Sequence, residues 1–312
     1  MLGTLALIIG VSTLFMTIIL SAIGAFSIVT LGIFVVGFNL LQWLFAPKMI
    51  DALYKVREVD KSKNPQLYGL VEELSRRMRM PMPKVMIAEM PISNAFAYGS
   101  PISGTRVAVT STLLRELEAE EVEAVVGHEL AHLKHKDVQI MMFASVLPAI
   151  FYYIGFSLMF ASMFGGLGGR GGGPVVLIGL GSMVVYWVLT LLILGLSRQR
   201  EYYADRRSVQ NVDDGARKLS EALAKIVESS SRMRLARRKG QAGKLDCFKT
   251  LFIEDVDRAA QDEVAIARAR IRHTDQQLVR EILARKVTFS NRLIELMSTH
   301  PNMVKRLRAL QR

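Results

Sequence analysis

The stretch GHELAHLKHKD, residues 127–137, contains two histidines four residues apart with a glutamate directly after the first. Acidic side chains precede it and lysines lie near its end, so the sequence predicts a helix over 119–137. On a helix, residues four apart lie on one face about one turn apart. His128 and His132 can therefore reach one ion, and Glu129 lies beside them.

Two imidazoles can bind one zinc ion at ~2.1 Å each, and the adjacent glutamate can hold and deprotonate a water molecule. The alternative is a solvated, charged helix that happens to contain histidines. A catalytic zinc needs a third protein ligand. His135 is seven residues after His128, a rise of ~10.5 Å along a helix, whereas two nitrogens on one zinc are at most ~4.2 Å apart. We therefore expect His135 to be a helix-end residue; His273 and His300 are too distant in sequence to judge.

Three long segments, 2–46, 138–169 and 171–197, contain no Asp, Glu, Lys or Arg. A helix needs ~20 apolar residues to cross the hydrocarbon core of a bilayer. We therefore predict four transmembrane helices, at about 3–23 and 26–46 and one in each later segment. A cleaved signal peptide is the alternative for the N-terminus, but the segment lacks a basic start and is too long.

The predicted hairpin of the third and fourth spans suggests where the third ligand lies. Its two ends must be neighbours, so SRQREYYAD (197–205) returns beside the two histidines. Glu201 can bind the metal, and Asp205, four residues later on the same helical face, can hydrogen-bond the far nitrogen of a histidine ligand. The alternative is surface pairing of these acids with neighbouring arginines, which are Arg198, Arg206 and Arg207.

Lysines and arginines flank the predicted spans on one side, after residue 47 and after residue 197. By the positive-inside rule, both hydrophilic parts face the cytoplasm, and the protein is a multi-pass protein of the cell membrane. The expected organisation is two N-terminal transmembrane helices, the first part of a cytoplasmic domain, a transmembrane hairpin and a second, helical part of that domain; their ranges are 1–46, 47–137, 138–197 and 198–312.

The net charge of +12 does not indicate a nucleic-acid partner. Much of the positive charge lies beside the predicted spans or in SRMRLARRKGQAGK (231–244), where anionic headgroups of the lipid bilayer attract it. The single cysteine, Cys247, excludes an internal disulfide and is expected to act as a small hydrophobic residue.

The hydrophilic parts indicate a mostly α fold with a small β-sheet. Apolar spacing predicts an amphipathic helix over 64–80, and the alternation in KVMIAE (84–89) and RVAVTS (106–111) predicts strands of a small antiparallel sheet with an exposed edge. The remaining hydrophilic chain is expected to be helical, over 198–228, 255–286 and 288–312. The glycine-rich link GGLGGRGGGP (165–174) is predicted to be a flexible connector.

Four motifs together resemble those of the HtpX-type membrane zinc peptidases, relatives of the CAAX prenyl proteases. They are NAF (94–96), HELAHLKHKD (128–137), EYYAD (201–205) and THPNMVKR (299–306). The combination of the second and third at this separation is specific, whereas the other two are weak alone. The resemblance covers most of the chain and is weakest around 230–270, to which we assign no function.

The resemblance implies an integral-membrane α+β zinc endopeptidase of the gluzincin type, with one zinc ion bound by His128, His132 and Glu201 and with Glu129 as general base. It places Asn94, Ala95 and Phe96 on an edge strand that pairs with the substrate backbone, since a free edge offers unpaired N–H and C=O groups. It also places His300 and Arg306 near the metal, where either could stabilise an oxyanion; the alternative for His300 and Pro301 is a helix start.

Because both ligand segments abut predicted spans, we expect the metal within ~10–15 Å of the membrane surface. The substrates would then be membrane proteins or other protein chains near the membrane, cut on their cytoplasmic side. The family further implies quality control of misfolded membrane proteins, a stress-response function. One alternative is a peptidase that processes prenylated proteins, against which four spans argue mildly. Another is a scaffold or metal sensor with structural zinc, but such a site closes its fourth position with a protein ligand, often Cys, and Cys247 has no partner motif.

Overall fold

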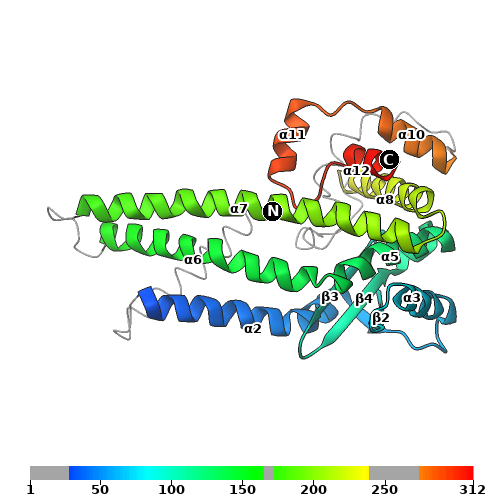
Figure 1. Cartoon of the computed structure of the whole chain (residues 1–312), viewed down its shortest axis with the longest axis horizontal. Helices are drawn as coiled ribbons and strands as arrows, with labels where there is room; N and C mark the ends of the chain where they lie inside the picture. Colours follow the sequence, from blue (N-terminus) through cyan, green and yellow to red (C-terminus); the bar gives the residue numbers. More distant parts are fainter. Residues whose placement is uncertain (1–27, 165–171, 239–273, 312) are drawn as a thin grey trace. The chain divides into compact units, whose positions relative to one another are not determined.

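The computed structural model describes residues 28–164, 172–238 and 274–311 (Figure 1). The first predicted span, residues 165–171 of the glycine-rich link, Cys247 and His273 lie outside these residues, whereas residues 172–174 of the link begin a helix and are not a flexible connector. The chain forms two compact units. One consists of the chain up to Leu44 together with Gln139–Leu196, and the other of Phe45–Val138 together with Ser197–Arg312.

The first unit is built from apolar helices. They belong to α2 (Ile28–Tyr54), α6 (Asp137–Phe164) and α7 (Gly172–Asn211). Among the described residues, Asp137–Met163 and Gly173–Asn211 are long and apolar enough to cross a membrane. Large apolar side chains on them are exposed, such as Phe143, Leu177 and Leu192, as expected of helices that face lipid rather than water.

Helices α6 and α7 form a closely packed hairpin, which Figure 1 shows as two neighbouring green helices. A Cβ atom added to Gly155 would lie 2.9 Å from the carbonyl oxygen of Gly179. The rings of Tyr152 and Tyr186 also meet, with centroids 5.2 Å apart. Small residues let transmembrane helices approach closely, and these glycines place the backbones of α6 and α7 in direct contact.

The second unit contains a four-stranded mixed sheet in the order β1-β2-β4-β3. Its strands are β1 (Val56–Glu58), β2 (Lys84–Ala88), β3 (Ala95–Ser100) and β4 (Gly104–Thr110). The predicted antiparallel sheet is wrong in one respect, since β2 and β4 are parallel. The reason is that β3 intervenes in sequence and forms a hairpin with β4, so β4 returns in the direction of β2.

Helices cover this sheet and complete the core. They are α3 (Pro65–Arg77), α4 (Ser111–Glu116), α5 (Ala119–Lys134), α8 (Gly215–Arg238), α10 (Asp275–Ala284), α11 (Phe289–Leu296) and α12 (Met303–Leu310). Helix α5 packs against β3 and β4 on one side and against α8 on another. It is therefore the central helix of this unit, and it carries the two histidines of HELAH.

Two predicted helices are interrupted. The helix expected over 198–228 breaks after Asn211, where Asp214 has a φ of +54° and a Cβ on Gly215 would lie 2.8 Å from the Cα of Val209. The helix expected over 288–312 breaks between α11 and α12, where Asn302 caps α12 directly after Pro301. Of the helix expected over 255–286, the described part is α10.

Candidate active site

Helix α5 places His128, Glu129 and His132 in the interior of the second unit. His128 and Glu129 are almost fully buried. The helix begins with a capping box in which the Glu118 backbone N–H donates to the Glu121 carboxylate at 2.7 Å. Burial of three ionisable side chains on one helix is costly unless each has a partner. The partners come from α7, from the start of α6, from β3 and from the chain after α11.

Gly127, directly before the first histidine, lets α7 approach α5. A Cβ atom at this position would lie 3.0 Å from Ser208 Oγ and 3.2 Å from Val212 Cγ2. Ser208 Oγ donates a hydrogen bond of 2.6 Å to the carbonyl oxygen of Ala124. The two helices therefore pack backbone to side chain at this point, and the sequence analysis assigned no part to Gly127 or Ser208.

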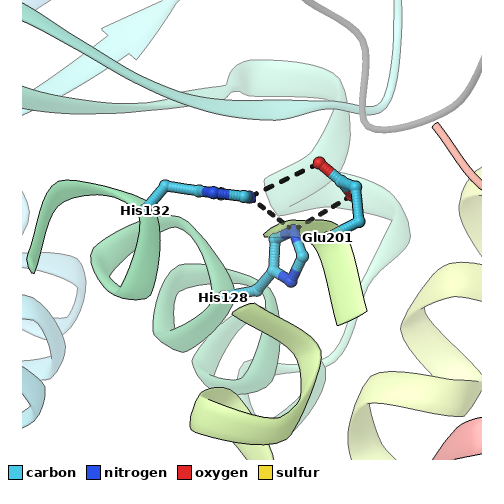
Figure 2. A group of neighbouring side chains, drawn as sticks. All are labelled: His128, His132 and Glu201. Atoms are coloured by element: carbon cyan, nitrogen blue, oxygen red, sulfur yellow. Dashed lines mark hydrogen bonds and ion pairs between the residues drawn. The ribbon is translucent and has the colours of Figure 1, made fainter. Parts of the chain in front are cut away.

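Glu201 on α7 completes a group of three with the two histidines (Figure 2). His128 Nε2 and His132 Nε2 are 3.2 Å apart. Glu201 Oε2 lies 3.6 Å from His128 Nε2, and Glu201 Oε1 lies 3.5 Å from His132 Nε2. The structure thus brings together the three side chains that the hairpin argument and the motif spacing selected.

This geometry fits zinc. Ligand atoms on a tetrahedral zinc ion with bonds of ~2.1 Å lie about 3.4 Å apart. The two imidazole Nε2 atoms are 3.2 Å apart, and each lies 3.5 or 3.6 Å from one of the two oxygens of the Glu201 carboxylate. Two imidazoles and one carboxylate are also a known ligand set of catalytic zinc, which keeps its fourth position for water or substrate. In the part of the chain that the structure describes, the group contains these three residues and no fourth ligand.

A carboxylate stands behind each histidine. Asp205 Oδ1 lies 2.9 Å from His128 Nδ1, the position predicted for it. Asp137 Oδ2 lies 2.7 Å from His132 Nδ1 and forms an ion pair with Arg200. Such carboxylates fix the tautomer and the orientation of an imidazole so that the other nitrogen faces the metal.

The sequence analysis assigned no role to Asp137 and placed it at the end of the helix expected over 119–137. In the structure α5 ends at Lys134 with His135 as its C-cap, Lys136 has a φ of +54°, and α6 begins at Asp137. This turn folds the Asp137 side chain back towards His132. An acid at the boundary of an apolar segment, five residues after a candidate ligand, was the signal that could have indicated it.

Arg306 and His300, which the resemblance places near the metal, both lie next to Glu201. The Arg306 side chain is completely buried, and its Nε and Nη2 donate to the two Asp205 oxygens at 2.9 and 2.6 Å. Its Nη1 lies 3.1 Å from Glu201 Oε2. His300 Nδ1 lies 3.3 Å from Glu201 Oε1. One arginine thus neutralises two buried carboxylates, and the His300 side chain is less buried than that of Arg306.

The electrostatics of the site favour a cation between the three ligands. Burial disfavours the charged form of His128, but the Asp205 and Glu201 carboxylates outweigh this effect and raise its pKa to about 10. Burial lowers the pKa of His132, and the neighbouring His128 lowers it further. The carboxylates therefore attract positive charge to this position, as a proton or as a metal ion.

Glu129 lies between the ligands and the sheet. Burial raises its pKa above the ordinary value, while the two histidines and a hydrogen bond from the backbone of Ala97 lower it. Ala97 is the third residue of β3. A carboxylate that contacts both the ligand cluster and a strand is in position to move a proton for a peptide lying along that strand.

Strand β3 forms one edge of the sheet, with β4 as its neighbour. Ala95 and Phe96 are its first residues, and Asn94 extends the pairing, since the Asn94 N–H donates to Thr110 Oγ1 at 3.0 Å and the Thr110 N–H to Asn94 O at 2.9 Å. Phe96 is buried against Tyr54, with ring centroids 5.8 Å apart. Side-chain burial fixes the strand, and the backbone of Ala97 within it contacts Glu129.

His135 caps the C-terminus of α5, and its ring packs edge-on against Tyr203 with centroids 5.9 Å apart. It does not belong to the three-residue ligand group found in the described chain. This position agrees with the prediction that seven residues of helix separate His135 too far from His128 for the two side chains to bind one zinc ion.

Comparison with known proteins bears on this arrangement. Residues 61–312 match peptidase family M48. The chain is 36% identical over 295 residues to a protease HtpX homolog of Thermoplasma acidophilum, which covers 93% of this chain and 87% of the relative. It is 38% identical over 291 residues to protease HtpX homolog 2 of Saccharolobus solfataricus, covering 91% and 86%.

Among solved structures, the crystal structure of S. mikatae Ste24p matches with a TM-score of 0.55 and 17% identity. The match covers 99% of this chain and 64% of the other, so this chain spans under two thirds of that protein. At this identity the similarity shows a shared fold and no more.

Proposed function

The chain belongs to peptidase family M48 and is a membrane zinc metallopeptidase, and from this premise we propose that His128, His132 and Glu201 bind its zinc ion. The observation that carries the assignment is that the two imidazole nitrogens and the Glu201 carboxylate converge, with contacts of 3.2–3.6 Å between neighbouring groups. Asp205 and Asp137 orient the two imidazoles from behind.

Zinc bound at this position supplies a Lewis acid, which lowers the pKa of a water molecule and polarises the scissile carbonyl. Glu129 is the general base. Its carboxylate takes a proton from the attacking water and then delivers that proton to the nitrogen of the leaving amine. The raised pKa of Glu129 supports this assignment, because a base that must later act as an acid works best with a pKa nearer to neutrality.

The substrate is a polypeptide, and we place it in extended form along β3. Pairing with the edge strand at Asn94, Ala95 and Phe96 would align its backbone with the sheet. The contact between the Ala97 backbone and Glu129 supports this placement, because it brings a peptide on this edge next to the base. Main-chain pairing also predicts broad side-chain tolerance.

His300 is our candidate for stabilising the developing oxyanion, whereas Arg306 acts through other groups. Every nitrogen of the Arg306 guanidinium contacts Asp205 or Glu201 and the residue is fully buried, so we propose that it positions both carboxylates. His300 is partly exposed and lies next to Glu201, which suits a side chain that also contacts substrate.

We further propose a multi-pass protein of the cell membrane with four spans, organised as 1–46, 47–137, 138–197 and 198–312, and with its peptidase domain in the cytoplasm. The two helices of suitable length and the flanking lysines and arginines support this topology. The substrates would then be misfolded or membrane-associated proteins, and the process protein quality control.

The mechanism is tested by replacing Glu129 with Gln and following cleavage of an unfolded membrane protein by the purified full chain in detergent. We expect cleavage to be lost while one zinc ion per chain is retained. The matched control is Glu120→Gln on the same helix, an exposed carboxylate paired with Arg217. Unchanged cleavage by the Glu129 variant would overturn the assigned mechanism.

The ligand assignment is tested separately by zinc content. Glu201→Gln should lose zinc, and His135→Ala should retain it. If the His135 variant lost its metal and the Glu201 variant did not, the third ligand would be wrongly assigned even though the family chemistry stands.

A further inference from the structure

Helix α11 exposes its apolar face and buries an acidic side chain, the opposite of what is usual for a helix on the surface of a water-soluble domain. Phe289, Leu293, Leu296 and Met297 follow the spacing i, i+4, i+7 and i+8, so they share one face. This face points outward, with Phe289 81%, Leu293 55% and Leu296 52% exposed, while Glu295 is buried. A contiguous group of large apolar side chains on a surface marks a site of interaction.

The orientation of α11 is fixed from inside. The Glu295 carboxylate accepts a hydrogen bond from the Asn302 N–H at 3.2 Å and pairs with Lys305 at 2.6 Å. Thr288 caps the start of the helix by accepting from the Asn291 N–H. Turning the apolar face inward would break the buried contacts of Glu295. The exposed face is therefore a fixed property of the fold.

The C-terminal end of α11 is held by Arg198 of α7. Arg198 Nη1 donates to the carbonyl oxygens of Glu295 at 2.8 Å, Leu296 at 3.2 Å and Ser298 at 2.8 Å. Carbonyl oxygens at the C-terminal end of a helix carry partial negative charge, so a cation beside them is favourable. Arg198 is the first charged residue after the uncharged segment 171–197. Hence α11 is attached at the point where α7 becomes polar.

We propose that α11 lies in the interface of the lipid bilayer, with the face formed by Phe289, Leu293, Leu296 and Met297 inserted at the boundary of headgroups and acyl chains. Its attachment to the end of the α7 span sets the right depth, and amphipathic helices bind there through such a face. The exposed Lys286 and Arg292 flank this face and suit anionic headgroups. The inference rests on the proposed spanning of α7.

The test uses site-directed spin labels on the full chain in proteoliposomes of mixed zwitterionic and anionic lipid. With Cys247 replaced by Ala, single cysteines are introduced for Leu293 and Leu296. The aqueous control is Glu72→Cys on the exposed side of α3, and the lipid control is Val188→Cys on α7, which is 51% exposed. Collision rates with oxygen, which concentrates in lipid, are compared with those of a water-soluble nickel chelate.

We expect the oxygen-to-nickel ratio at Leu293 and Leu296 to be several-fold that at Glu72 and below that at Val188. A ratio equal to that of Glu72 would overturn the proposal and leave a water-facing helix. Labels that are shielded from both reagents would also overturn it, because a second copy or another segment of the chain would then cover the face. A water-like ratio at Val188 would instead refute the span of α7, so failure of the two ideas can be told apart.

Discussion

Helices α5 and α11 depart from the usual burial pattern in opposite directions. Helix α5 buries His128 and Glu129 in the protein, whereas α11 exposes Phe289 and Leu293. In α5 each buried charge faces a neighbouring charge, and in α11 the single buried acid is fully paired. Local departures from burial rules concentrate at functional sites. The buried charges of α5 therefore suit the binding of a cation, whereas the exposed apolar face of α11 suits, by our inference, contact with lipid.

The largest loss of stability is expected from removing the positive charge of Arg306, which pairs with the buried carboxylates of Asp205 and Glu201. Arg306→Met would leave Asp205 and Glu201 without their shared partner, at a cost of roughly 3–5 kcal/mol in unfolding free energy. Thermal unfolding in detergent measures this loss. Arg308→Met, two residues later on α12 and exposed, is the matched control and should shift stability by under about 0.5 kcal/mol. Equal shifts for both variants would show that the buried charges do not depend on Arg306.

The next effect comes from pushing α5 and α7 apart. Gly127→Val would place side-chain atoms against Ser208 and Val212 and should cost about 1–3 kcal/mol, with weaker zinc binding because Glu201 moves away. Gly69→Val on α3, where a Cβ atom meets nothing within 4 Å, carries the same change in helix propensity without a clash. A similar loss of stability in the two variants would contradict the close approach at Gly127.

A smaller effect, on zinc affinity, is expected from changing Asp137, whose carboxylate lies beside His132 Nδ1. Asp137→Asn keeps the shape of the side chain but removes the negative charge beside His132 Nδ1, so zinc affinity should fall about 10–100-fold. Competition with a chelating dye measures the affinity. Asp213→Asn removes an acid whose side chain is 89% exposed, and it should leave the affinity unchanged. An unaltered affinity in Asp137→Asn would show that the turn after α5 does not support the metal site.

The smallest effect is expected on α11 itself. Because Leu293 lies on the outward face, Leu293→Gln should change the unfolding free energy in detergent by no more than about 0.5 kcal/mol. Thermal unfolding again gives the measurement. A loss of about 2 kcal/mol or more would mean that Leu293 packs in a protein core and would remove the contrast with α5.

The metal ligands could be predicted from the sequence because residue types that bind zinc occur there at a spacing that helix geometry can interpret. The four-residue spacing of His128 and His132 and the return of an apolar hairpin were sufficient to select Glu201, because both arguments depend on local geometry. Distances between sequence-remote atoms were not accessible, so Asp137 behind His132 and the pairing of Arg306 with two acids emerged only from the fold. The resemblance had indicated that Arg306 lies near the metal, but not what it contacts.

The errors in the fold have a common cause. Helical spacing continues across 212–214 and 297–302, and no apolar pattern marks where the chain turns; the breaks depend on Asp214 with positive φ and on the cap at Asn302. The parallel pairing of β2 with β4 likewise depends on the path of β3, which short strands do not reveal. Roles of Asn94, Ala95, Phe96 and His300 stay predictions.

Because α7 is one continuous helix, it fixes the distance between its apolar segment and Glu201. It runs from Gly172 through the apolar segment to Asn211, and Glu201 stands four residues, or ~6 Å, beyond Ser197. One residue inserted between these two positions would turn Glu201 by ~100° away from the histidines. If α7 spans the bilayer and substrates are membrane proteins, as we propose, the cleavage sites should cluster at a constant number of residues from the end of the substrate's own apolar segment.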